Sequence, residues 1–405
     1  MKPSVRNILF ITWDGPETRY LERLFLPILA GLRDRGLRPH VLQFGWGAPE
    51  VFHSRAELCR AAGIPYRAKS ILRRGGGAGP FFTALTGAGP IRRAVAEWRI
   101  DTLLPRSLMP ALAVLRLTPA ERAALNIVFD ADGLPADERV DFAGLSPLGA
   151  TYRLLRDIEM RMLLSSDAVL TRTAAARDIL LARAGGGLPA TRVHLVTNGV
   201  DPAPFAAALA ARQDVPPGDP VLCYCGSIGP QYRLPEMLDL ATRMRARIPG
   251  LRFRLISPAT DVIRAELARR GLDGAGWIES RPARPEEVPA ELARCDLGLA
   301  LRQPAFSTRA VLPIKLGEYL LAGLPVLGTP GVGDTAPLEA EGLFHSAEAE
   351  ATDKLLDWVT GTVLPARKAL RDRAHAAGLR GFSLAAATDC YAEALATLTR
   401  SGDEG

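Results

Sequence analysis

The chain of 405 residues has few cysteines, few aromatic residues and no long apolar run. Its five cysteines are odd in number and show no Cys-x-x-Cys spacing, which argues against a disulfide framework and a structural zinc site. No stretch of about 20 apolar residues occurs, so no segment is expected to span a bilayer. The apolar run Ile8–Ile11 is too short for a signal peptide. These absences predict a cytoplasmic protein, soluble or peripheral at the inner face of the membrane.

The pattern of apolar runs predicts an α/β fold with two domains. At 405 residues the chain exceeds one typical core, and short β-rich runs alternate with helical patterns such as 20–35 and 55–62. A first series of strands is expected at 8–12, 40–44, 102–105, 126–129, 168–170 and 193–197. A second series is expected at 221–225, 252–256, 277–279, 297–301 and 325–327. The turn 198–202 and the Pro-rich linker 216–220 predict domains 1–200 and 201–405, with the last helix able to return to the first.

Positive charge is concentrated in one segment. The formal net charge is +6, and residues 53–99 hold nine basic residues against Glu57 and Glu97, with Phe81, Phe82 and Trp98 among them. Such a segment suits a membrane-docking face, and a mixed solvated surface is the alternative. Nucleic acid is disfavoured because no recognised binding motif accompanies the charge. The Gly-rich stretch 75–80 is predicted to be a loop. The basic residues are Arg55, Arg60, Arg67, Lys69, Arg73, Arg74, Arg92, Arg93 and Arg99.

The segment 313–326, PIKLGEYLLAGLPV, is typical of a loop, a helix of about three turns, a tight turn and a buried strand. Pro313 suits the first helical position and Gly323 the left-handed residue after the helix. Lys315 lies in the first turn, where the helix dipole disfavours a cation, and this indicates a bound anion. Glu318, one turn later, can accept hydrogen bonds from ribose hydroxyls. A surface helix with a Lys–Glu pair explains the same residues equally well.

This segment resembles the P-x-K-x-x-E-Y-x-x-A-G-x-P-V signature of the large family of retaining GT-B glycosyltransferases, of the bacterial polysaccharide type. The resemblance implies two Rossmann-like β/α/β domains facing across a deep cleft. It also implies a UDP- or GDP-sugar donor in the second domain, a glycan or lipid-linked acceptor in the first, and neither cofactor nor metal. Glu318 is then the ribose ligand, and the loop 306–313 with Lys315 receives the diphosphate. A second family glutamate is replaced by Ala310, which leaves Ser307, Thr308 and Arg309 as polar candidates.

A second donor segment follows the expected strand 221–225. The run 226–229, GSIG, precedes a helix expected to start near Arg233 or Leu234, a geometry that lets backbone amides approach a phosphate. A plain turn is the alternative. The resembled family commonly has Gly-Arg here and a lysine several residues later, whereas this chain has Ser227 and then Tyr232 or Arg233. We therefore predict donor contacts from Gly226, Ser227 and Arg233.

Two loops of the first domain follow expected strands, where ligands of doubly wound folds bind. The first carries Asp14, Gly15 and Glu17, and Asp14 suits either an acceptor hydroxyl or the cap of the next helix. The second, 130–139 (DADGLPADER), suits either a polar site or a solvated loop with helix-capping acids. It resembles the D-x-D of metal-dependent transferases, which have a different fold, so a metal role is rejected. Asp132 and Asp14 are the catalytic candidates, and the acceptor ligands are predicted to be Gly15, Glu17, Glu138 and Arg139.

The sequence thus favours a transferase that moves a hexose from a UDP- or GDP-sugar to a glycan or lipid-linked acceptor in cell-surface polysaccharide biosynthesis. Retention of configuration follows from the resemblance alone. A sugar-nucleotide epimerase or hydrolase is a rival within enzymes, because GT-B folds also serve these reactions. A non-catalytic partner that binds a nucleotide or glycan in a biosynthetic complex is the rival outside enzymes, and Ala310 and Ser227 keep it open.

Overall fold

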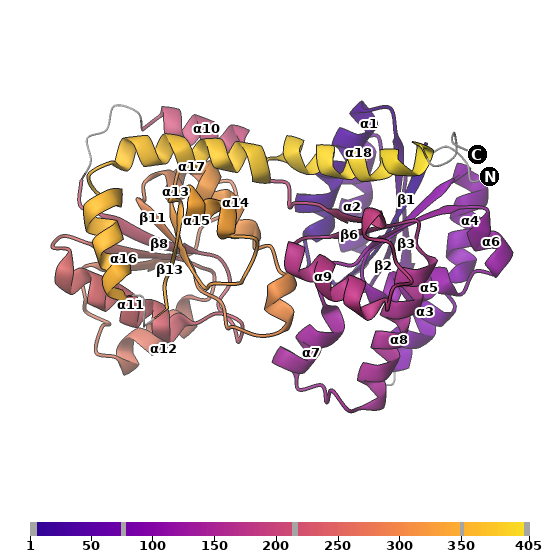
Figure 1. Cartoon of the computed structure of the whole chain (residues 1–405), viewed down its shortest axis with the longest axis horizontal. Helices are drawn as coiled ribbons and strands as arrows, with labels where there is room; N and C mark the ends of the chain where they lie inside the picture. The colour runs from indigo at the N-terminus through magenta and orange to yellow at the C-terminus, as the bar shows by residue number, and fades with distance from the viewer. Residues whose placement is uncertain (1–5, 74–77, 213–217, 349–351, 401–405) are drawn as a thin grey trace. The chain divides into compact units, whose positions relative to one another are not determined.

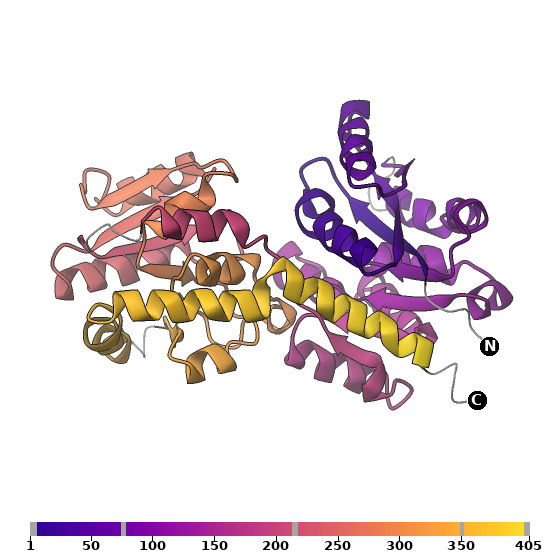
Figure 2. The same ribbon diagram turned by 90° about the horizontal axis from the view of Figure 1, so that it is seen from above.

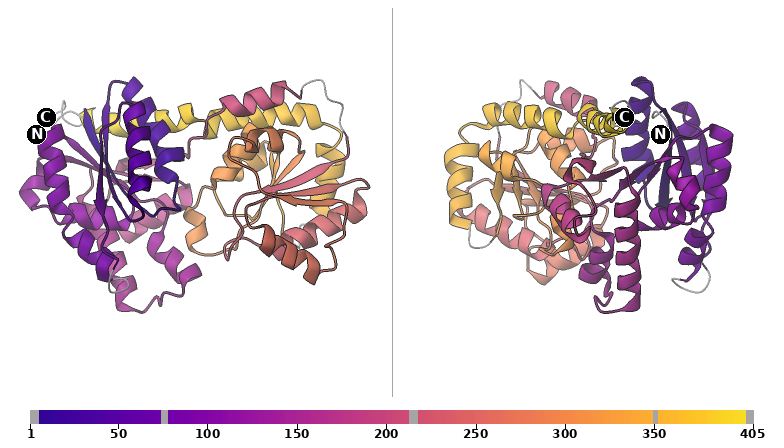
Figure 3. Two further views of the ribbon diagram at one scale, coloured as in Figure 1. Left: turned by 180° about the vertical axis from the view of Figure 1, so that it is seen from behind. Right: turned by 45° about the vertical axis from the view of Figure 1, so that its right-hand side comes forward.

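The structure is a computed structural model that describes residues 6–73, 78–212, 218–348 and 352–400 (Figure 1). The chain forms two compact units, Met1–Gly199 with Ala387–Gly405, and Val200–Ala386. Each unit contains one parallel sheet with helices on both faces, as Figure 3 shows. The α/β prediction is confirmed. Among the described residues, no helix combines the length and the apolar character needed to cross a membrane.

The sheet of the first unit has seven parallel strands in the order β3-β2-β1-β4-β5-β6-β7. Strand β1 is fully apolar at Ile8–Ile11, and these side chains are at most 1% exposed because helices cover both faces. The strand order reverses between β1 and β4, so the loops that follow these strands diverge and leave room for a ligand. The strands are β1 (Asn7–Asp14), β2 (Arg38–Gly45), β3 (Tyr66–Ser70), β4 (Thr102–Pro105), β5 (Asn126–Asp130), β6 (Ala168–Thr171) and β7 (Val193–Leu195).

The helices of the first unit include a segment from the far end of the chain. The last helix, α18 (Leu384–Arg400), belongs to this unit from Ala387 onward and packs on α1. The packing is close at Gly31, where an added Cβ would lie 2.8 Å from the Thr388 side chain. The other helices are a π-helical turn (Leu21–Phe25), α1 (Leu26–Asp34), α2 (Pro49–Ala61), α3 (Ala78–Leu85), α4 (Ala88–Trp98), α5 (Leu108–Leu115), α6 (Pro119–Ala123), α7 (Pro135–Ala143), α8 (Ala150–Ser165), α9 (Ala174–Arg183) and the 3-10 turn Ala190–Arg192.

The second unit has six parallel strands in the order β10-β9-β8-β11-β12-β13, and here the order reverses between β8 and β11. The strands are β8 (Val221–Cys225), β9 (Arg252–Ile256), β10 (Ile278–Arg281), β11 (Leu297–Ala300), β12 (Val326–Gly328) and β13 (Phe344–Ser346). The helices are α10 (Ala203–Ala210), α11 (Leu234–Arg247), α12 (Thr260–Arg269), α13 (Val288–Ala293), the 3-10 turn Ser307–Ala310, α14 (Ile314–Leu321), α15 (Ala336–Ala340), α16 (Thr352–Trp358), a π-helical turn (Val359–Val363) and α17 (Arg367–Phe382).

Helix α14, which carries the Lys-x-x-Glu motif, packs closely against α17 (Figure 2). Two glycines allow this approach. A Cβ on Gly317 would meet Phe382 at 2.8 Å, and a Cβ on Gly378 would lie 2.7 Å from the backbone nitrogen of Leu321. A side chain at either position would push the helices apart, so this packing sets the position of α14 against the sheet.

All eleven strands expected from the sequence are present, with ends within two residues of the prediction. Strands β3 and β13 were missed. Both are edge strands of three to five residues, and β3 is largely exposed, so neither shows a clear apolar run. The predicted loop 75–80 is wrong at its end, because α3 begins at Ala78. Its residues 75–77 and residues 216–217 of the expected linker lie outside the described part of the chain.

Candidate functional site

Three predicted donor residues of the second unit, Gly226, Ser227 and Lys315, meet near the end of β8. Gly226 follows β8 with φ of +138°, a conformation that only glycine adopts readily. A Cβ on Gly226 would lie 3.1 Å from Nζ of Lys315, so the loop after β8 and the first turn of α14 are in contact. The structure thus brings together two segments that are far apart in the sequence, at the point where the strand order reverses.

The amine of Lys315 lies between two tyrosine rings. Its Nζ is 4.1 Å from the ring centre of Tyr224 and 4.4 Å from that of Tyr232, and it donates a hydrogen bond of 2.9 Å to the Tyr224 hydroxyl. That hydroxyl in turn donates to the backbone oxygen of Ser227. The chain Lys315–Tyr224–Ser227 therefore holds both the amine and the loop after β8 in place.

A second cation lies at the same tyrosine. Arg302 follows β11, is 9% exposed, and places its guanidinium 5.3 Å from the ring centre of Tyr232 while donating to the Gln231 side chain. Among the described residues, neither Lys315 nor Arg302 forms an ion pair with a carboxylate. Lys315 and Arg302 are largely buried, share one aromatic ring and form no ion pair with a described carboxylate, so an anion bound beside them would stabilise their charged forms.

The pKa of Lys315 reflects this environment. Burial, and then the neighbouring charge of Arg302, lower the pKa of the Lys315 amine to about 7, while the field of Glu318 acts in the opposite direction. The ordinary value is about 10.4. A bound anion would stabilise the charged amine and move its pKa back toward that value. The predicted anion site at Lys315 is therefore consistent with the surroundings of the amine, which the sequence alone did not reveal.

Helix α14 is shorter than expected, Ile314–Leu321, and Pro313 is its N-cap, with ψ of 128°, rather than its first helical residue. Gly323 has φ of +75°, as predicted for the residue that ends the helix. Glu318 is half-buried one turn after Lys315. Its charge, after the larger effect of burial, contributes to the raised pKa of Cys225, about 12, which places the carboxylate near the end of β8.

Three other predicted donor residues, Ser307, Thr308 and Arg309, belong to the 3-10 turn Ser307–Ala310 that precedes α14. Ser307 and Thr308 are buried in the 3-10 turn before α14, and the Thr308 hydroxyl is bonded to both backbone groups of Ala305. Arg309 is exposed and lies 5.7 Å from the ring centre of Phe306.

Arg233 is the N-cap residue of α11, so the helix starts at Leu234 as expected. Its guanidinium forms ion pairs with Glu348 at 2.7 Å and Glu236 at 3.2 Å. A phosphate would have to compete with two carboxylates there. The sequence reasoning assigned phosphate binding to Arg233 and did not consider Arg302, whose only signal was its place as the first polar residue after the buried run 297–301.

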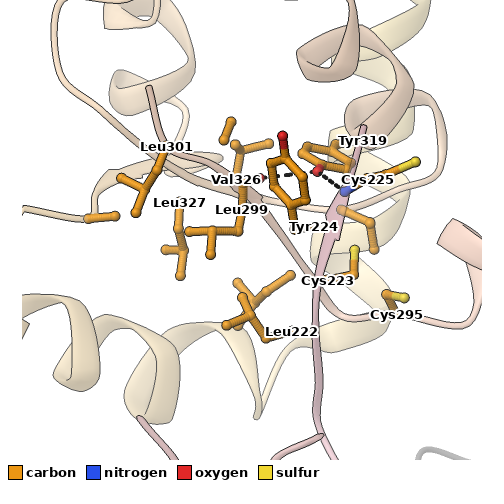
Figure 4. Close-up of a cluster of buried hydrophobic side chains, with 14 of the residues drawn as sticks. Leu222, Cys223, Tyr224, Cys225, Cys295, Leu299, Leu301, Tyr319, Val326 and Leu327 are labelled. Atoms are coloured by element: carbon orange, nitrogen blue, oxygen red, sulfur yellow. Dashed lines mark hydrogen bonds between the residues drawn. The ribbon is translucent and has the colours of Figure 1, made fainter. Parts of the chain in front are cut away.

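Buried packing beneath the site fixes its two strands (Figure 4). The hydroxyl of Tyr319 accepts a hydrogen bond of 2.8 Å from the amide of Cys225 and donates one of 3.1 Å to the backbone oxygen of Leu299. Its ring covers Gly298, where a Cβ would be 2.6 Å away. Tyr319, from the same helix as Lys315, therefore links the ends of β8 and β11 and sets the register of the site above them.

The first unit contains a cavity of about 490 Å³, a volume typical of small-ligand sites. It lies at the carboxyl ends of β1, β2, β4 and β5, around the point where the strand order of this sheet reverses. Three predicted residues line it, Asp14, Asp132 and Arg139, and so does Arg106, which the sequence reasoning missed. Two non-glycine residues with positive φ, Ser107 (66°) and Asp132 (53°), also line it, and such strain is typical of functional sites.

The acids of this cavity are held by buried partners. Nη2 of Arg106 lies 2.7 Å from Oδ2 of Asp132, and burial raises the pKa of the Asp132 carboxyl while Arg106 opposes the shift. A carboxyl with a raised pKa is a candidate general acid or base. Asp14 is 2% exposed and accepts hydrogen bonds from Thr12 (2.6 Å) and Gln43 (3.2 Å).

Two alternatives from the sequence are wrong. Asp14 does not cap the next helical segment, which starts at Leu21 with Tyr20 as its cap residue. The loop after β5 is not simply solvated, because Ala131 and Leu134 are buried and Asp132 forms an ion pair with Arg106 at 2.7 Å.

The remaining acceptor candidates differ in position. The backbone of Gly15 is buried against Trp46, whose ring would be 2.6 Å from an added Cβ, so glycine is needed for the ring to lie there. Arg139 is exposed and lines the cavity, whereas the exposed Glu17 and Glu138 are not among the lining residues.

The basic segment 53–99 is not one uniform surface. Arg55 is buried and bonded to Glu22 at 2.6 Å, so counting it as surface charge was wrong. Arg67 pairs with Glu97 at 2.6 Å, and Trp98 stacks on His40 with ring centres 5.2 Å apart. Arg74 lies outside the described residues. Membrane contact through this segment stays a prediction, with fewer exposed groups to support it.

The sequence of this chain is similar to that of a known protein over part of its length. No family model matches the chain. Over 240 residues the chain is 29% identical to "Putative teichuronic acid biosynthesis glycosyltransferase TuaH" of Bacillus subtilis (strain 168), a match that covers 56% of this chain and 55% of that protein. The chain thus spans about half the length of the curated relative it matches.

Solved structures match over nearly the whole chain. Anabaena HepE, solved with UDP and glucose, covers 97% of this chain and 100% of its own, with TM-score 0.67 and 16% identity. The lipopolysaccharide outer core galactosyltransferase WaaB covers 96% and 99%, with TM-score 0.67 and 13% identity. The chain has the GT-B fold. A UDP-GlcNAc 2-epimerase of Neisseria meningitidis is also similar, with TM-score 0.59, 12% identity and coverage of 96% and 100%, so the GT-B fold does not by itself decide the reaction.

Proposed function

We propose that this protein is a glycosyltransferase that moves a hexose from a UDP-sugar to a glycan or lipid-linked acceptor, with retention and without a metal, in cell-surface polysaccharide biosynthesis. The observation that carries the proposal is the pair of cations Lys315 and Arg302, which share Tyr232 and form no ion pair with a carboxylate in the described part of the chain. The sequence match to TuaH and the UDP and glucose bound by HepE support it. The HepE complex favours UDP over GDP as the donor nucleotide.

In this proposal the donor diphosphate binds beside Lys315, Arg302 and Gly226, and Glu318 accepts hydrogen bonds from the ribose. Ser227, Ser307, Thr308, Arg309, Pro313 and Arg233 remain proposed donor contacts. As the glycosidic bond breaks, negative charge grows on the diphosphate, and two fixed cations stabilise that charge more than they stabilise the bound donor. Cations already buried in place need no reorganisation during the reaction.

The acceptor is proposed to bind in the cavity of the first unit. Asp132, with its raised pKa, and Asp14 are the candidates for orienting the attacking hydroxyl. Gly15, Arg139, Glu17 and Glu138 are the proposed acceptor ligands. With retention, attack on the face that the diphosphate leaves would make the diphosphate the base.

Nucleotide binding tests the donor half of the proposal. Thermal melting with UDP, GDP and ADP should give a shift with UDP, because ligand at about a hundred times its Kd adds roughly 2.7 kcal/mol. Glu318→Gln should weaken UDP binding. The wild type should bind 2′,3′-dideoxy-UDP more weakly than UDP, whereas the variant should bind both ligands equally, since its hydroxyl contact is already lost. Glu286→Gln is the matched control, an exposed glutamate of the same unit.

The outcomes separate the candidate functions. Additive losses from Glu318→Gln and the dideoxy analogue would refute the ribose assignment. Release of UDP from a UDP-sugar in the absence of any acceptor would favour an epimerase or hydrolase, as the similarity to the epimerase structure allows. No melting shift with any nucleotide would favour the non-catalytic alternative.

A further inference from the structure

We infer that the cavity of the first unit selects an acceptor that carries a negatively charged group, a carboxylate or a phosphate, next to a sugar ring. This inference rests on the proposed function, since it names the class of acceptor. It starts from the charged side chains that line the cavity, which are Arg73, Arg106 and Arg139 against Asp14 and Asp132. The cavity therefore has an excess of positive charge.

The partners of these groups decide which charge remains for a ligand. Asp132 is neutralised by Arg106 at 2.7 Å. Arg73 and Arg139 are both exposed, and neither forms an ion pair with a described carboxylate. Asp14 is the one lining acid left, and its Oδ2 already accepts two hydrogen bonds from neutral groups. Two guanidinium groups are thus available to a ligand at the cavity.

Arg106 and the backbone supply further hydrogen-bond donors at the cavity, which suit an anion. The side chain of Arg106 is 9% exposed, and its Nε has no hydrogen-bond partner among the described residues. The first turn of α5, from Leu108, lines the same cavity, and its N-cap residue Ser107 makes no side-chain hydrogen bond to the helix. The first amides of a helix lack partners within the helix, and its dipole favours a negative charge there.

Aromatic side chains supply the second part of the inference. Trp13, Tyr20, Trp46 and Phe81 line the cavity beside the arginines. The ring of Trp46 lies against Gly15, and the guanidinium of Arg73 lies 4.8 Å from the ring centre. A ring that holds an arginine at its face presents an apolar surface next to a charge. An acidic sugar has the same combination, an apolar ring face next to a carboxylate or phosphate.

Matched probes test this inference by calorimetry on the full chain with saturating UDP. Methyl β-glucuronide has a carboxylate at C6 where methyl β-glucoside has a hydroxymethyl group. Glucose 6-phosphate carries a phosphate on the oxygen at C6. We expect one anionic probe to bind at least about tenfold more tightly than the glucoside. The double variant Arg73→Gln/Arg139→Gln should remove this preference, since charge-assisted hydrogen bonds account for roughly ten- to hundredfold in binding. Arg93→Gln, an exposed arginine of the same unit outside the cavity, is the control.

Each outcome has a distinct meaning. Preference for the glucuronide or for glucose 6-phosphate identifies the carboxylate or the phosphate as the recognised group. Equal binding of the glucoside, absence of binding by both anionic probes, or a preference that survives in the double variant would overturn the inference. Loss of UDP binding in the double variant would also overturn it, by assigning the arginines to the donor. A UDP melting shift in the wild type shows that the donor proposal stands when this inference fails.

Discussion

The low pKa of Lys315 leads to a quantitative prediction about UDP binding. In the free protein, burial and Arg302 lower the pKa of the amine to about 7, so at pH 8 about 0.9 of the molecules carry a neutral Lys315. If the diphosphate binds at this amine, the pKa in the complex returns toward its ordinary value of about 10.4. UDP binding at pH 8 should therefore take up about 0.9 proton.

The sign of the pH dependence follows from the same two values. The complex holds the proton more tightly than the free protein between pH 7 and the pKa of the complex, so affinity falls as pH rises in that window. From pH 7 to pH 9 the apparent Kd should rise about fiftyfold. Between pH 7 and pH 9 the terminal phosphate of UDP does not obscure this change, because its second pKa is about 6 and it is mostly ionised there.

Isothermal titration calorimetry in two buffers of different ionisation enthalpy measures the proton uptake directly. Lys315→Met should abolish the uptake at pH 8 and flatten the pH dependence, whereas Lys354→Met, an exposed lysine of the same unit, should leave both unchanged. Uptake near zero in the wild type at pH 8, or equal uptake in Lys315→Met, would refute the assignment of the diphosphate to this amine.

Three further predictions concern particular positions. Gly226→Ala should weaken UDP binding more than tenfold, because φ of +138° and the nearby Lys315 amine disfavour a Cβ at this position. Gly229 has open space around it, so Gly229→Ala should bind UDP as the wild type does. The Kd values from UDP titrations of both variants test this. Tyr319→Phe should lower the free energy of unfolding in urea by about 1–3 kcal/mol, since two buried backbone groups lose their partner, and an unchanged midpoint would contradict this. Gly15→Ala should displace Trp46 and reduce binding of the preferred anionic probe without changing UDP binding, and a reduction in both would point to a global effect.

Much of the fold could be predicted because its signals are local. Every expected strand was a short run of apolar residues, and eleven such runs are strands in the structure. The missed strands, β3 and β13, lie at sheet edges. Most of their side chains are half-buried or exposed, so their sequences do not form a clear run of apolar residues. The helix of the Lys-x-x-Glu motif was predicted one residue early, because Pro313 fits both the first helical position and the cap.

The sequence by itself determined which residues carry chemistry close together along the chain. Lys315 and Glu318 share a helix face because they are three residues apart, and Gly226 and Gly323 take conformations that a side chain would disfavour. Only the tertiary structure decided what surrounds them. Strand order joins β8 to β11 and so brings Tyr224, 91 positions away, within 2.9 Å of Lys315.

The same reasoning applies to charge. In the sequence Arg55, Arg73 and Arg106 are three similar basic residues. In the structure the first is a buried partner of Glu22, the second covers Trp46 at the cavity, and the third neutralises Asp132. A charge acquires its role from burial and from the distance to its counter-charge, and both depend on segments that meet only when the chain folds.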